Sequence, residues 1–297
     1  MLRLEGITKR IKDRLVLSNL SITIEAGRVY GLLGPNGAGK TTTINIICGL
    51  IKPDGGQVCI ADTPSTPKTK TLLGVAPQQN LIYQTLTCRE NLAFFGKIYG
   101  LQGKKLQQRI LECLALVDLT DRMDSPAETL SGGMQRRLSL AIALVHQPRL
   151  VILDEPTTGL DIEARYQIWE VIRHLQRSGT TILLTTHLLE EAERLCDKIG
   201  ILHQGKLIAE GTLPQLRRYV QAQEIVTIQT PDEQAILDRG KALGLVSRRY
   251  GNELAFWLPE LLDLKEILTY FDGIPIDGIS RHPVRLEHIY LEVMGYI

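Results

Sequence analysis

The sequence predicts an α/β protein with a mainly parallel sheet, followed by a smaller α+β domain. Three apolar runs, 28–34, 149–156 and 180–187, are short and rich in branched residues, as strands buried on both faces are. A helical pattern over 162–176 separates the last two runs. Strand, helix and strand in this order imply a right-handed crossover and a parallel sheet.

The elements between these runs follow from local signals. The first strand leads into a glycine loop and a helix that begins near Lys40, and 52–62 combines a Pro-Asp-Gly-Gly turn with a strand. The pattern from about 85 to 118 is helical: Thr87 and Glu90 have capping-box spacing. Its predicted apolar stripe comprises Leu106, Ile110, Cys113 or Leu114, and Val117.

The last third of the chain changes character. Residues 211–223 are expected to form a short helix and a linker. After them we predict strand 224–230, helix 232–243, two strands turning at Gly251–Asn252, helix 261–271, strand 275–280 and helix 286–294. The β-α-β-β-α-β order is typical of a ferredoxin-like domain.

Composition excludes several classes of protein. Thirty-four basic and 33 acidic residues leave a net charge of +1, so no nucleic-acid partner is expected from bulk charge. The five cysteines lie far apart without a C-x-x-C pair, which argues against zinc and disulfides and favours a reducing cytosol. No apolar run approaches the roughly 18 residues of a membrane span, and no signal peptide is expected.

The segment "GPNGAGKTT" predicts a phosphate site. It fits G-x-x-x-x-G-K-[ST] after a strand and before a helix, the context in which this motif is credible. Backbone N–H groups of such a loop surround phosphates, while Lys40 reaches the β and γ oxygens and Thr41 ligates Mg²⁺. The candidate nucleotide-binding residues are Gly34, Pro35, Asn36, Gly37, Ala38, Gly39, Lys40, Thr41 and Thr42.

Two acidic residues end a buried strand, at the edge where parallel sheets bind ligands. Asp154 is predicted to hold Mg²⁺ and Glu155 to polarise a water in line with the γ-phosphate. His187 follows the next strand and is a candidate to contact the γ-phosphate or orient Glu155. The alternatives are ordinary helix caps for the acids and a structural histidine.

A second phosphate cradle is predicted in "TLSGGMQRRLSLAIALV". Ser131 stands at an N-cap position, two glycines follow, and Leu138, Ala141, Ile142 and Val145 have helical spacing. The exposed N–H groups and positive end of such a helix form an anion site.

Five motifs in order, "GPNGAGKTT", "LSGGMQ", "LVILDEP", "TTGLD" and "TTH", resemble the ATP-binding cassette (ABC) ATPase family over residues 1–215. The resemblance implies a P-loop NTPase fold with an antiparallel β subdomain and a helical subdomain at about 85–135. The change in composition near 211–223 and the pattern that follows it place a linker at 216–223 and a small accessory domain at 224–297. The resemblance also implies ATP and Mg²⁺ as cofactors and Gln78 as a metal-contacting lid-loop residue. Ser131, Gly132, Gly133 and Asp161 would contact the nucleotide of a second subunit, so that two subunits enclose two ATP molecules.

Two departures accompany the resemblance. Met134 stands where the family signature usually has glutamine, and Ile11 stands where an aromatic residue commonly stacks on adenine. We expect Ser131 and its glycines to keep their role. Since stacking on a base contributes about 1–3 kcal/mol in nucleic-acid sites, we expect GTP to compete with ATP here.

The resemblance implies a subunit of a transporter, closer to exporters of drugs, lipids or polysaccharides than to importers. The expected partners are a transmembrane permease and a second ABC subunit, which places the chain at the cytoplasmic face of the membrane. The aromatic residues Tyr83, Phe94, Phe95 and Tyr99 either form a groove for a helix of the permease or pack in the core. One alternative is a soluble ABC ATPase that remodels nucleic acid, ribosomes or assemblies, although long heptads and a second cassette are missing. Another is a non-catalytic regulatory module.

Overall fold

The computed structural model describes residues 1–251 and 253–295. They divide into two compact units, Met1–Glu210 and a second that begins at Gly211. The predicted first domain extends further, to residue 215. Each unit has its own sheets and core.

A six-stranded sheet forms the centre of the first unit, in the order β10-β9-β3-β8-β7-β6. Its strands are β3 (Val29–Leu33), β6 (Leu73–Ala76), β7 (Leu150–Asp154), β8 (Thr181–Thr186), β9 (Lys198–His203) and β10 (Lys206–Gly211). The pairs β3–β8, β3–β9, β7–β8 and β6–β7 are parallel. The predicted mainly parallel sheet is therefore confirmed, and it brings the ends of β3, β7 and β8 to one edge.

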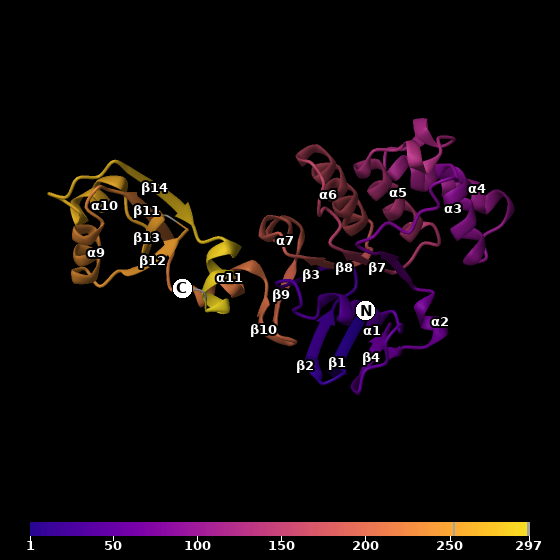
Figure 1. Cartoon of the computed structure of the whole chain (residues 1–297), viewed down its shortest axis with the longest axis horizontal. Helices are drawn as coiled ribbons and strands as arrows, with labels where there is room; N and C mark the ends of the chain where they lie inside the picture. The colour runs from indigo at the N-terminus through magenta and orange to yellow at the C-terminus, as the bar shows by residue number, and fades with distance from the viewer. Residues whose placement is uncertain (252, 296–297) are drawn as a thin grey trace. The chain divides into compact units, whose positions relative to one another are not determined.

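A second sheet of the first unit is antiparallel, in the order β2-β1-β4-β5. It contains β1 (Leu2–Ile11), β2 (Arg14–Ile24), β4 (Gly55–Ile60) and β5 (Thr63–Pro64). Figure 1 shows α1 (Lys40–Ile47) beside this sheet, on the side of the six-stranded sheet opposite α6 (Ile162–Arg177) and α7 (Leu189–Leu195). This is the antiparallel β subdomain that the resemblance implied.

Helices α3 (Cys88–Ile98), α4 (Gly103–Leu116) and α5 (Gly132–Leu144) gather in one region (Figure 1). The helical pattern predicted over 85–118 is interrupted at Gly100, whose φ of +82° is left-handed and ends α3. The predicted capping box of Thr87 and Glu90 is present. A short helix, α2 (Pro67–Lys70), precedes β6. None of the helices in the described residues combines the length and apolar character that crossing a membrane requires.

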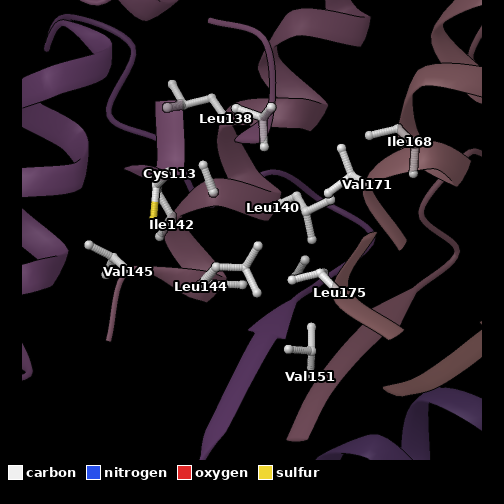
Figure 2. Packing of buried hydrophobic residues seen from close by; sticks show 14 of the residues in the cluster. Cys113, Leu138, Leu140, Ile142, Leu144, Val145, Val151, Ile168, Val171 and Leu175 are labelled. Carbon is white, nitrogen blue, oxygen red and sulfur yellow. The ribbon is translucent and has the colours of Figure 1, made fainter. Parts of the chain in front are cut away.

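Two hydrophobic cores lie on the two faces of the six-stranded sheet, because alternate residues of a strand point to opposite faces. From β7, Val151 and Leu153 join the core with α3 to α6, whereas Leu150 and Ile152 join the core with β1, β2 and α1. Figure 2 shows α5 between its neighbours, with Ile142 near Cys113 of α4 and Leu140 near Val171 of α6. Apolar packing thus holds α5 against the sheet.

The second unit has one antiparallel sheet, ordered β12-β13-β11-β14. Its elements are α8 (Leu213–Leu216), a 3₁₀ turn (Arg217–Tyr219), β11 (Glu224–Gln229), α9 (Glu233–Ala242), β12 (Val246–Tyr250), β13 (Glu253–Leu258), α10 (Leu264–Tyr270), β14 (Gly278–Pro283) and α11 (Leu286–Met294). Helix α9 follows β11 and helix α10 follows β13, as predicted for a ferredoxin-like domain. The predicted β-α-β-β-α-β order is confirmed.

Two predicted boundaries in this unit are wrong. Helix α10 begins at Leu264 rather than at residue 261, because Asp263 and Glu266 form a capping box that defines its first turn. Strand β14 covers Gly278–Pro283 rather than 275–280, since its partner β11 pairs Gln229 with Gly278. Asn252 of the predicted turn lies outside the described residues.

Candidate nucleotide site

The glycine loop connects β3 to α1 and is folded around Lys40. Gly39 has a φ of +113°, and a Cβ there would lie 2.6 Å from a Leu17 methyl carbon, so only glycine fits. A Cβ at Gly34 would lie 2.3 Å from the carbonyl oxygen of Leu202. These constraints explain why the loop needs glycine at both positions.

Lys40 and Glu155 form a buried ion pair at the carboxyl edge of the sheet. Lys40 is 6% exposed and Glu155 is 7% exposed, and Lys40 Nζ lies 3.3 Å from Glu155 Oε1. Lys40 Nζ also donates to the Gly34 carbonyl at 2.6 Å. Because desolvating two charges offsets much of their attraction, such a pair contributes little to stability and marks a candidate functional site.

His187 and Thr158 contact the other oxygen of Glu155. His187 Nδ1 lies 2.6 Å from Glu155 Oε2, and Thr158 Oγ1 donates to that oxygen at 3.0 Å. The predicted neighbours Glu155 and His187 are therefore in direct contact. Thr158 was not predicted as a site residue, although it belongs to the quoted motif "TTGLD".

The backbone at Glu155 is unusual. Its φ of +50° is left-handed, which costs a residue other than glycine on the order of 1–3 kcal/mol and persists only where neighbours enforce it. The Glu155 N–H donates to the carbonyl of Thr185 at 3.0 Å. Asp154 lies on the same strand end and is 5% exposed, with its Oδ1 accepting from Thr185 Oγ1 at 2.5 Å.

A hollow of about 630 Å³ lies over the glycine loop, and we call it the glycine-loop hollow. Ten of the predicted residues line it: Pro35, Asn36, Gly37, Gly39, Lys40, Thr41, Thr42, Gln78, Glu155 and His187. In the lid loop, residues 76–80, Gln78 lines the hollow and the adjacent Gln79 does not. Ile11, which is 44% exposed, lies at its rim with Arg14 and Val16.

The predicted oxygen donors for a metal fit Mg²⁺ by type. Thr41 and Gln78 line the glycine-loop hollow, and the Asp154 carboxylate lies at the end of β7 beside it. Mg²⁺ prefers such oxygen ligands and is usually bound through one or two carboxylates together with substrate phosphates. The side chains therefore suit a cation that arrives with a nucleotide.

A separate hollow of about 390 Å³ lies at the second predicted phosphate site, the N-terminus of α5, and we call it the signature hollow. Ser131, Gly132, Gly133 and Asp161 line it. Ser131 caps α5 by accepting from the Met134 N–H, and Asp161 caps α6 by accepting from the Ala164 N–H at 2.8 Å. Two helix N-termini thus meet at this hollow. Among the described residues it shares no lining residue with the glycine-loop hollow.

Another hollow, of about 1020 Å³, lies between the end of α4 and α6. It contains none of the predicted nucleotide residues, and volume alone does not make it the reactive site.

Two buried groups near the nucleotide site were not predicted from the sequence. Burial raises the pKa of Glu191, whose Oε1 accepts from Thr157 and Trp169, and burial lowers the pKa of Arg136. The sequence signal for Arg136 was a basic pair inside an otherwise apolar helix.

A glycine loop at the carboxyl edge of a parallel sheet, with a buried lysine facing an acidic strand end, defines a P-loop nucleotide-binding protein. The family model for ABC transporters matches residues 17–158. The chain belongs to this family: it is an ATP-binding subunit of an ABC transporter and an ATPase, as its motifs predicted.

Curated relatives match 98% and 73% of the chain. Nod factor export ATP-binding protein I of Burkholderia lata is 38% identical over 293 residues, covering 98% of this chain and 95% of the relative. Linearmycin resistance ATP-binding protein LnrL of Bacillus subtilis is 43% identical over 219 residues, covering 73% of this chain and 70% of the relative. These matches confirm the predicted exporter-type branch.

Solved structures resemble the first unit. An ATP-binding cassette in a dimeric post-hydrolysis state bound to ADP and Pi is 28% identical, with a TM-score of 0.65, and covers 72% of this chain and 99% of that chain. The ATP-binding subunit of an ABC transporter is 32% identical, with a TM-score of 0.67, and covers 73% of this chain and 92% of that chain.

Proposed function

We propose that this subunit hydrolyses ATP between two cassettes to drive export through a separate permease. The contact of one carboxylate, Glu155, with both Lys40 and His187 at the rim of the glycine loop carries the proposal. This contact brings the lysine that binds phosphate, the candidate general base and a histidine together in the glycine-loop hollow.

The glycine loop binds the triphosphate. N–H groups at the start of α1 and the Lys40 ammonium neutralise the β and γ oxygens. Thr41, Gln78 and Asp154 would hold Mg²⁺, which would supply positive charge against the negative charge of the phosphates. Ile11 and Arg14 also line the hollow and would contact the nucleobase.

Glu155 is the general base. Its carboxylate takes a proton from the attacking water, and His187 and Thr158 hold that carboxylate in position through Oε2. Lys40, which contacts Oε1, is then drawn to the phosphates by their greater negative charge. The strained φ of Glu155 directs its side chain into the hollow.

The signature hollow completes the nucleotide site of a second subunit. Ser131, Gly132 and Gly133 present the N-terminus of α5, and Asp161 begins α6 beside them. A two-fold dimer repeats this contact, so two nucleotides are enclosed. Loss of the γ-phosphate weakens the contact and favours opening.

The permease binds the helical region. Tyr83, Phe94 and Tyr99 are exposed, whereas Phe95 packs against the core. Tyr83 and Phe94 meet edge to face at 4.8 Å, and Ile98 beside them is also exposed. An apolar surface of this kind suits a helix of the partner, which would hold the chain at the cytoplasmic face of the membrane.

The decisive variant is Glu155→Gln. We expect it to bind ATP, to lose about 10³-fold in kcat because the base is gone, and to accumulate as a dimer on a sizing column. The matched control is Glu170→Gln, an exposed glutamate of α6 paired with Arg173, which should behave as the parent. Turnover by Glu155→Gln within about tenfold of the parent would exclude Glu155 as the base.

A further inference from the structure

Arg136 connects three segments of the nucleotide site. It lies in the second turn of α5, after the Ser131 cap, and is only 6% exposed. Its guanidinium points away from α5 toward the end of β7 and the lid loop, where it contacts main-chain carbonyls. A buried arginine must have its donors satisfied, so these contacts determine where it lies.

One edge of the guanidinium contacts the acidic strand end. Nε donates to the Pro156 carbonyl at 2.8 Å, and Nη2 donates to the carbonyls of Asp154 at 2.8 Å and Glu155 at 3.2 Å. Three consecutive carbonyls therefore converge on one side chain. This convergence holds the turn in which Glu155 has its left-handed φ.

The other edge contacts the lid loop. Nη1 donates to the carbonyls of Pro77 and Gln78, the latter at 3.3 Å, and to Asn80 Oδ1 at 3.2 Å. Gln78 lines the glycine-loop hollow. A single planar group thus sets the position of the lid loop relative to the carboxylate of Glu155.

We propose that Arg136 is a positioning residue for ATP hydrolysis. Its hydrogen bonds connect helix α5 and the lid loop to the turn that orients Glu155. Movement of α5 then shifts the turn and the loop together. Arginine is required because six acceptors surround it on two edges, and the three donors of a lysine ammonium cannot reach both. The inference rests on the role proposed above for Glu155.

Arg136→Lys tests the inference. We expect kcat to fall on the order of 10²-fold, because small displacements of reacting groups have effects of that size, while KM for ATP changes by less than about threefold. The matched control is Arg109→Lys. Arg109 also donates to two carbonyls, those of Leu144 at 2.9 Å and Val145 at 3.2 Å, but at the far end of α5. Arg109→Lys should also lower the melting temperature, because these hydrogen bonds are lost, and should leave kcat within about twofold.

A milder variant covers the case in which Arg136→Lys does not fold. Asn80→Ala removes one acceptor from the lid-loop edge without leaving a charge unpaired, and we expect about a threefold to tenfold lower kcat at unchanged melting temperature. Its effect should vanish in the Arg136→Lys background, since the contact is already lost there.

The results for these variants distinguish the positioning role of Arg136 from the proposed function. If Arg136→Lys or Asn80→Ala keeps the parent kcat while Glu155→Gln is inactive, the positioning role is wrong and the proposed function stands. The same follows if Arg109→Lys lowers kcat equally. If Glu155→Gln itself remains active, the proposed function fails first.

Discussion

The two hollows of the first unit are built differently although both suit phosphate. The glycine-loop hollow contains buried opposite charges in contact, Lys40 and Glu155, beside a histidine and a strained backbone. The signature hollow offers an exposed hydroxyl, glycines and two capped helix N-termini. Ser131 and Asp161 accept hydrogen bonds from the Met134 and Ala164 N–H groups at these two N-termini.

This difference distinguishes a site suited to hydrolysis, the glycine-loop hollow, from a site suited to binding phosphate, the signature hollow. Buried charges and strain cost stability and are kept where a reaction needs them. Helix N-termini with local caps cost little and can bind an anion without reacting with it. We therefore expect changes in the signature hollow to affect the assembled dimer and changes in the glycine-loop hollow to affect each subunit.

Ser131→Asp has a large expected effect, although a smaller one than Glu155→Gln. Aspartate caps a helix as well as serine does, so α5 should keep its stability, but its charge repels the phosphates of the opposite nucleotide. We expect turnover to fall about 10²-fold while ATP binding to the isolated subunit stays within about twofold. Ser131→Thr is the control. Unchanged turnover would mean that the signature hollow contacts no nucleotide.

Mixing two inactive variants sharpens the comparison. Lys40→Ala damages only the glycine-loop hollow and Ser131→Asp only the signature hollow. A mixed dimer has one intact composite site, so an equal mixture should regain about a quarter of parental turnover. Phosphate release measured against the ratio of the two variants checks this. Recovery absent at every ratio would contradict assembly of the site from two subunits.

Ile11→Tyr has the smallest expected effect. A ring at the rim of the glycine-loop hollow would stack on the base, and such stacking contributes about 1–3 kcal/mol. We expect the parent to accept GTP and ATP at comparable concentration and the variant to bind ATP roughly tenfold more tightly. Competition between ATP and GTP tests the first expectation and an ATP binding titration tests the second, with Ile11→Leu as the control. A strong ATP preference in the parent would refute the expected loose selectivity.

Much of the fold could be predicted because local signals were strong. The strands at β3, β7 and β8 are continuous apolar runs, and α6 and α11 begin at the predicted residues, 162 and 286. The shifts of α10 and β14 were less predictable, because a cap and a pairing register decide such boundaries. Of the antiparallel sheet, β4 was predicted from the turn and strand signals of 52–62, whereas the other strands were expected only from the family resemblance.

By itself, the sequence determined the chemistry available: a glycine loop with a lysine, an acidic strand end, a histidine and a serine-capped helix, each specified by residues close together in the chain. Only the tertiary structure decided how they meet. The turn at Glu155 is held by Thr185 and by Arg136, and Arg136 also contacts the lid loop at Pro77, Gln78 and Asn80. These residues are separated by tens of positions in the chain, and no local pattern encodes contacts over that separation.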